Sequence, residues 1–164
     1  MSAASAGAVV AWGHVRRPCM RGRTGVRALK REGDGATPRG TFTPLYVLYR
    51  ADRRRRPRTK LPVRGLLPDD GWCDAAMDRN YNRPVTHPYP ASAERLWRAD
   101  RLYDVIVVLS HNQCPRVAGA GSAVFMHVTS DDRRPTAGCI ALAPRDLDVL
   151  IRHLTPSTRL VFTT

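Results

Sequence analysis

The chain has 164 residues, 43% of them hydrophobic, and its 27 Lys and Arg against 14 Asp and Glu give a net charge of +13. This length suits one domain that buries its own core without disulfides or metals, and no apolar run is long enough to cross a membrane. The excess of arginine indicates either a polyanionic partner, such as nucleic acid, acidic lipid or a cell-wall polymer, or a genome biased towards arginine codons.

The cysteines and the N-terminus carry few further signals. Four cysteines lie at positions 19, 73, 114 and 139, without a CxxC pair or a zinc-site spacing, so we expect no metal and leave disulfides open. Residues 1–12 lack a basic region ahead of their short apolar stretch. We therefore interpret that stretch as a first strand rather than a signal-peptide core.

Hydrophobic periodicity predicts seven regular segments, in chain order: strands over residues 8–15 and 41–49, a helix over 92–100, strands over 105–109 and 122–128, a helix over 144–154 and a strand over 159–163. The helix over 144–154 is the clearest, because Pro144 suits a first helical position and the leucines that follow share one face. The prediction is a mainly β domain with one or two helices, either a β-sandwich or a β-barrel.

Two stretches between these segments are irregular. Residues 50–58 are a basic run containing Pro57, typical of a solvated loop. Residues 66–90 are rich in Pro, Asp, Asn and Gly, and they predict a long insertion that covers part of a functional groove. Its aromatic side chains, Trp72, Tyr81 and Tyr89, indicate that the insertion is ordered.

The densest chemical pattern runs from the end of the predicted strand over residues 122–128 to the start of the helix over 144–154. A strand ends near His127, a polar loop follows, and Thr136-Ala137-Gly138-Cys139 leads towards the helix. A thiol needs a base to become a good nucleophile, and a glycine lets a carbonyl approach backbone N–H groups that face an oxyanion. Taken singly, such a cysteine is usually a core residue and such a histidine a satisfied polar group. Their joint occurrence predicts Cys139 as nucleophile, His127 as base and Gly138 beside them.

These residues resemble the YkuD-type L,D-transpeptidases, whose signature is a His at a strand end, a loop, and then Ser/Thr-His-Gly-Cys. Upstream, Thr37-Pro38-Arg39-Gly40-Thr41-Phe42 is similar to the Thr-Pro-x-Gly-x-Phe segment of the family. There are departures: Ala137 replaces the second His, Ala141 replaces an Asn or Arg, and His127 lies only 12 residues before Cys139. Residues 66–90 have no counterpart in the signature.

The resemblance implies one YkuD-like catalytic domain over residues 1–164 that cross-links peptidoglycan through a cysteinyl acyl-enzyme, without cofactor or metal. Donor and acceptor would both be stem peptides. Similarity to a compact proteobacterial branch suggests links from stem residue one to residue three. We expect a monomer that contributes to cell-wall biogenesis and cell shape in the periplasm or at the cell wall, with the cytoplasm as the alternative because no signal peptide is visible.

Seven further residues are predicted to bind substrate, namely His111, Asn112, Trp72, Tyr81, Arg134, Thr136 and Arg145. Arg134 and Arg145 can hold stem carboxylates through bidentate forks. His111 follows a buried strand, where functional loops are common, although a simple turn explains it equally well. His111 or a backbone carbonyl is expected to orient His127. Trp72 and Tyr81 either wall the groove or anchor their loop.

Two alternatives stay open. With water as acceptor, the same thiol chemistry gives an L,D-carboxypeptidase or an amidase that trims wall peptides. A basic nucleic-acid-binding module is the alternative of another class. The charge and the run of arginines at residues 53–56 favour it, but a reading helix and paired aromatics on strands are missing from the sequence pattern.

Overall fold

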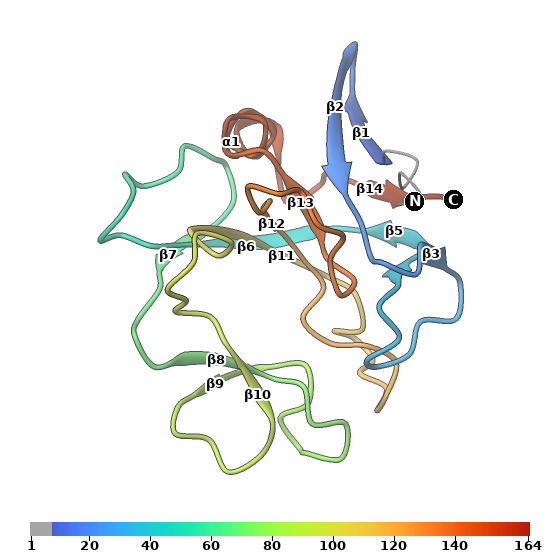
Figure 1. Ribbon diagram of the computed structural model, residues 1–164, viewed down its shortest axis with the longest axis vertical. Coiled ribbons are helices and arrows are strands. Elements are labelled where there is room, and N and C mark those ends of the chain that lie inside the picture. The colour runs from blue at the N-terminus through green and yellow to red at the C-terminus, as the bar shows by residue number, and fades with distance from the viewer. Residues whose placement is uncertain (1–7) are drawn as a thin grey trace.

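The computed structural model describes residues 8–164 and contains four sheets and one helix (Figure 1). The elements are β1 (Ala8–Trp12), β2 (Val15–Met20), β3 (Val26–Arg27), β4 (Thr37–Pro38), β5 (Gly40–Phe42), β6 (Pro44–Tyr49), β7 (Val63–Gly65), β8 (Asp70–Cys73), β9 (Pro84–Thr86), β10 (Ala93–Arg95), β11 (Val105–Leu109), β12 (Phe125–Val128), β13 (Ile140–Leu142), α1 (Pro144–His153) and β14 (Leu160–Phe162). The prediction of a mainly β, sandwich-like domain is confirmed.

The main sheet has seven strands in the order β1-β2-β13-β12-β11-β6-β7. Every residue of β11 is buried, as the unbroken apolar run predicted for a central strand. Successive side chains of a strand point to opposite faces, so the buried residues of β11 and β12 divide between two apolar clusters. The sheet therefore has a core on each face.

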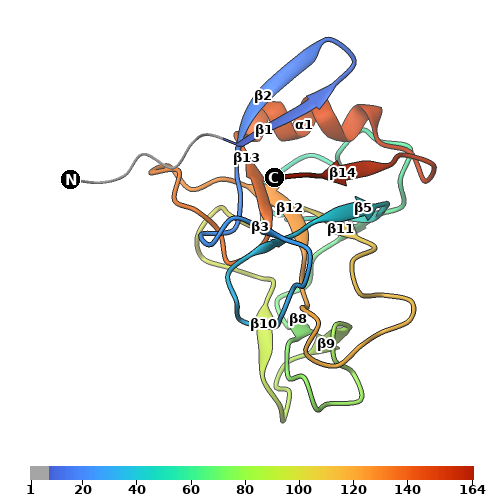
Figure 2. The ribbon, with the colours of Figure 1, turned by 90° about the vertical axis from the view of Figure 1, so that its right-hand side faces the viewer.

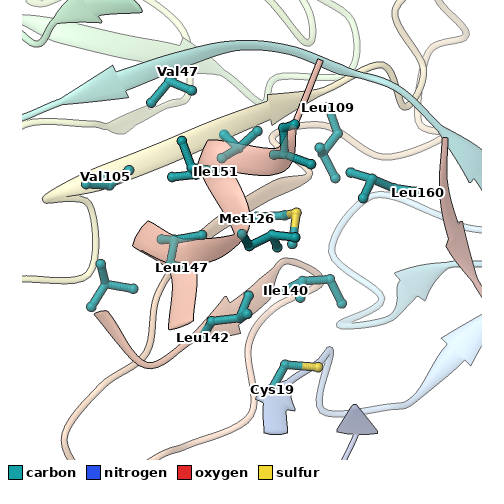
Figure 3. Close-up of a cluster of buried hydrophobic side chains, with 14 of the residues drawn as sticks. Cys19, Val47, Val105, Leu109, Met126, Ile140, Leu142, Leu147, Ile151 and Leu160 are labelled. Carbon is teal, nitrogen blue, oxygen red and sulfur yellow. The ribbon is translucent and has the colours of Figure 1, made fainter. Parts of the chain in front are cut away.

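The first core lies between the sheet and α1. Leu147 and Ile151 of the helix lie beside Val105 and Met126 of the sheet (Figure 3). Burying each such side chain fully contributes about 1.5–3 kcal/mol, so the amphipathic face of α1 is enough to fix the helix on the sheet. The predicted helix is confirmed, and it ends at His153 with Leu154 as its cap.

The second core lies on the opposite face and supports the candidate site. Phe125 on β12 packs there with Trp72 and Leu96, and Cys139 belongs to the same cluster. Because His127 is two residues after Phe125 on β12, its side chain points to this face as well. A small sheet of order β10-β8-β9 covers this side, at the end of the molecule opposite α1 and the β1–β2 hairpin (Figures 1 and 2).

The helix predicted over residues 92–100 is wrong. Residues 93–95 form β10, which pairs antiparallel with β8 so that Glu94 lies opposite Trp72. A stretch this short gains little from helical hydrogen bonds, whereas an open strand edge offers its backbone partners at once. Leu96 is then buried in the second core, at 1% exposure.

Three further expectations need correction. The predicted strand over 8–15 is a hairpin, because the chain turns at Gly13, whose φ of +53° suits glycine. The strand over 41–49 is divided into β5, which pairs with β14, and β6, which pairs with β11. The basic run is only partly solvated, since Arg50 is 4% exposed and its guanidinium stacks on Trp97 at 3.6 Å.

The single helix found among residues 8–164, α1, is not long and apolar enough to cross a membrane.

Candidate active site

Cys139 and His127 line one cavity of about 760 Å³ on the second-core side of the sheet. The loop before β13 supplies Thr136, Ala137 and Gly138 to its wall, and β10 supplies Glu94. Asp74 comes from the predicted insertion, so residues 66–90 do contribute to the wall of this cavity. Cys139, just before β13, and His127, on β12, thus line the same cavity, as expected for the nucleophile and base proposed from the sequence.

The thiol of Cys139 is held by the backbone of the opposite wall. Its Sγ donates a hydrogen bond to the carbonyl of Ala123 at 3.1 Å and accepts one from the N–H of Phe125 at 3.4 Å. Burial, with the negative charge of Glu94 as a second cause, raises the pKa of Cys139 to about 12. The Cys139 side chain is therefore a neutral thiol at rest.

The imidazole of His127 is oriented by a backbone carbonyl. Its Nδ1 lies 2.8 Å from the carbonyl oxygen of Val128, which can only accept, so Nδ1 carries the proton and Nε2 is left as the basic nitrogen. The ring of Tyr103 meets it edge-on, with centroids 5.2 Å apart. Burial lowers the pKa of His127 to about 4, so the imidazole is neutral at rest.

The two side chains line the same cavity, without a direct hydrogen bond between them in the described residues. Within residues 8–164, the hydrogen bonds of the Cys139 sulfur go to Ala123 and Phe125 and not to His127. Catalytic contacts are often looser before substrate binds.

Two threonines hold the loop that carries the nucleophile. Thr136 donates from its hydroxyl to the carbonyl of Cys139 at 2.6 Å and accepts from the N–H of Gly138 at 3.1 Å. Thr37 donates to the carbonyl of Gly138 at 2.9 Å and accepts from the N–H of Gly22 at 2.9 Å. The N–H of Gly138 is thereby occupied, which leaves the N–H of Cys139 as the candidate oxyanion donor of the pair.

Gly138 is required by the tight approach of this loop to residue 36. Its φ is +148°, and a Cβ at this position would lie 2.8 Å from the carbonyl oxygen of Ala36. Any larger residue would move the nucleophile or the upstream segment, because real Cβ atoms do not come that close. The upstream and downstream motifs of the sequence are therefore parts of one loop contact.

A family model of the L,D-transpeptidase catalytic domain, YkuD, matches residues 7–162 of the chain. The chain belongs to the YkuD family. No curated protein and no solved structure matches it. YkuD domains are L,D-transpeptidases that act on peptidoglycan peptides, generally outside the cytoplasm.

Thr37 of this YkuD domain gives a direct test of the loop contact. Thr37→Val keeps the shape but leaves the buried N–H of Gly22 and carbonyl of Gly138 without partners, at a cost of about 1–3 kcal/mol. We expect the melting temperature to fall by about 3–10 °C and activity to fall with it. Thr41→Val, at an exposed position of β5, is the matched control and should melt like the wild type. Equal melting of both variants would refute the bracing role of Thr37.

Of the residues predicted to bind substrate, two line the cavity of the YkuD domain. Thr136 acts in the loop as described, and Arg134 lies exposed at the rim, paired with Asp132. Arg145 lies at the start of α1 and is not among the lining residues. On this side of the cavity the positive charge therefore comes from the loop before Cys139 rather than from α1.

The other four predicted residues support the cavity from behind. Trp72 and Tyr81 are 1% and 4% exposed, and Trp72 packs edge-on against Phe125 with centroids 5.0 Å apart. The loop-anchoring alternative thus describes them better than a wall contact. His111 bonds the carbonyl of Ala120 through Nε2 at 3.0 Å, and Asn112 caps the same loop through the carbonyls of Val117 and Gly121.

One buried residue outside the seven predicted to bind substrate connects the insertion to Cys139. Asn82 is 1% exposed, and its Oδ1 accepts from Trp72 Nε1 at 2.9 Å and from the N–H of Ala123 at 3.1 Å. Its Nδ2 donates to the carbonyls of His111 and Asn112. Ala123 is the residue whose carbonyl holds the Cys139 thiol, so Asn82 positions the wall against which the thiol rests.

Proposed function

We propose that the domain cross-links peptidoglycan stem peptides through a thioester on Cys139. One observation carries the proposal: a cysteine and a neutral histidine with a free Nε2 line the same cavity, on a loop braced by both threonines of the family pattern. The family acts on peptidoglycan peptides, which supplies the substrate class. Following the compact branch that the sequence resembles, we assign the link to the first residue of one stem and the third of another.

In the acylation step, the sulfur of Cys139 attacks a peptide carbonyl while His127 Nε2 takes the thiol proton. A C–S bond forms, the C–N bond of the donor breaks, and His127 returns the proton to the leaving amine. The N–H of Phe125, which already donates to the sulfur, favours the thiolate as it develops. We assign the N–H of Cys139 to the oxyanion. These residues need no cofactor for this step.

In the second step, the amine of another stem peptide attacks the thioester and releases the thiol. Water in place of the amine would give the L,D-carboxypeptidase or amidase alternative, with the same residues and the same first step. Because this substrate lies in the cell wall, we propose that the enzyme acts in the periplasm or at the cell wall, in keeping with the family.

The nucleic-acid alternative finds less support in the basic run. Arg53 pairs with the buried Asp104, and Arg54 holds Asp148 of α1 through two contacts at 2.6 and 2.7 Å. Side chains committed to intramolecular carboxylates are poor phosphate ligands, because a phosphate must first displace those carboxylates. We therefore do not propose this function.

Product analysis tests the proposal. Purified sacculi incubated with the enzyme should yield dimeric muropeptides joined from stem residue one to residue three, identified by mass spectrometry after muramidase digestion. The heat-denatured enzyme is the control. Trimmed monomers without new dimers would instead assign the hydrolase alternative.

A further inference from the structure

Glu94 is a carboxylate in the wall of this cavity that makes no ion pair within residues 8–164, although the charge of Arg98 lies near enough to act on it. Four cations line the cavity: Lys30, Arg98 and Arg134 are each paired with an aspartate, and the exposed Arg23 forms no ion pair within residues 8–164. Among residues 8–164, no ion pair reaches Glu94, whose Oε1 accepts instead from the hydroxyl of Tyr103 at 2.6 Å.

The backbone and Tyr103 hold this carboxylate in place. Glu94 lies in the middle of β10, and the pairing of β10 with β8 fixes its direction. Tyr103 is 6% exposed and touches the ring of His127 edge-on, so one side chain joins Glu94 to the base. The charge of Glu94 contributes to the raised pKa of Cys139, which places the carboxylate within electrostatic reach of the reacting sulfur.

A second wall residue also lacks a partner. Asp74 Oδ1 is buried and has no hydrogen-bond partner in the described part of the chain. Asp74 lines the same cavity, and its charge adds to the burial that raises the pKa of Glu94. A buried carboxylate oxygen without a partner is costly, which favours a ligand that brings a hydrogen-bond donor or a cation to this wall.

We propose that Glu94 binds the ammonium group of the acceptor peptide and takes its proton before the amine attacks the thioester. The inference rests on the proposed function. An amine is nucleophilic only after it loses a proton, and the ammonium form supplies the cation that Glu94 lacks. Attraction between the two charges is stronger in a partly buried cavity than in water. Burial raises the pKa of the Glu94 carboxyl group, and a raised pKa brings it closer to the pKa of a useful general base.

The proton balance of the step is complete. Glu94 takes one proton from the ammonium group, and the neutral amine forms a C–N bond with the thioester carbonyl carbon. The C–S bond breaks, and Cys139 leaves as thiolate. His127 takes the second proton from the nitrogen and passes it to the sulfur, which restores the thiol. Glu94 then gives its proton to water.

Glu94→Gln tests the assignment because glutamine keeps an acceptor for the Tyr103 hydroxyl but removes the charge. With a stem peptide as donor and a second stem peptide as acceptor, we expect thioester formation at close to the wild-type rate. The acceptor KM should rise, and transfer should fall by about 10²-fold, at the lower end of the range for general-base catalysis. Hydrolysis of the thioester should take its place. Asp131→Asn, an exposed loop carboxylate outside this cavity, is the charge-matched control.

Three results have distinct meanings. An unchanged ratio of transfer to hydrolysis in Glu94→Gln, with normal thioester formation, would overturn the role of Glu94 and leave the proposed function intact. Loss of thioester formation in a folded Glu94→Gln variant would also overturn it, since the residue would then act in the first step. Failure of the wild type to form a thioester would instead overturn the proposed function itself.

Discussion

Cys139→Ala is expected to reduce cross-link formation to the uncatalysed background. The covalent intermediate requires the sulfur, and no other cysteine lies in the cavity that contains His127. Because the Cys139 side chain is small, alanine leaves the second core nearly filled, and the variant should fold. The measurement is the yield of dimeric muropeptides from sacculi at equal concentrations of folded enzyme.

Cys114→Ala is the matched control for this experiment. Cys114 is exposed, whereas Cys19 and Cys73 are buried, so only its removal leaves the packing untouched. We expect Cys114→Ala to retain wild-type activity. Cross-linking by Cys139→Ala at the wild-type level would show that the thiol is not the nucleophile.

His127→Ala is expected to slow thioester formation by about 10²–10⁴-fold, the usual contribution of a general base. At rest the thiol pKa of about 12 and the imidazole pKa of about 4 keep both groups neutral. The reaction therefore needs His127 to accept the proton as the sulfur attacks, and not an ion pair formed beforehand. Single-turnover rates of thioester formation provide the measurement.

His14→Ala is the control for the loss of an imidazole, since His14 lies exposed in the β1–β2 hairpin. It should react at the wild-type rate. If His127→Ala also keeps that rate, another group takes the thiol proton and the role of His127 must be abandoned.

The parts of the fold that could be predicted are those in which one local signal dominates. The apolar run of β11 and the amphipathic face of α1 each bury enough surface to decide their own structure. Residues 93–95 have no such signal, and their strand exists only because the edge of β8 is available. Neither segment alone predicts its pairing with another segment about twenty residues away.

The same distinction applies to the site. Cys139 and His127 stand out because a histidine at a strand end followed by a Gly-Cys pair before a helix is an uncommon combination of reactive residues. Asn82 and Glu94 look like ordinary polar residues in the sequence. Their importance comes from contacts that the sequence pattern does not show, with Ala123 for Asn82 and with Tyr103 for Glu94. Thr37 is intermediate, since the motif around it was visible but its bond to Gly138 was not.

The most direct test of the central claim is to identify the covalent intermediate. The wild type should be mixed with a stem-peptide donor in the absence of acceptor, quenched in acid within the first turnover, and analysed by intact and peptide mass spectrometry. We predict a mass increase equal to the donor acyl group, located on Cys139 and absent from Cys139→Ala. Donor turnover with an unmodified Cys139, or with the acyl group on another residue, would contradict the account.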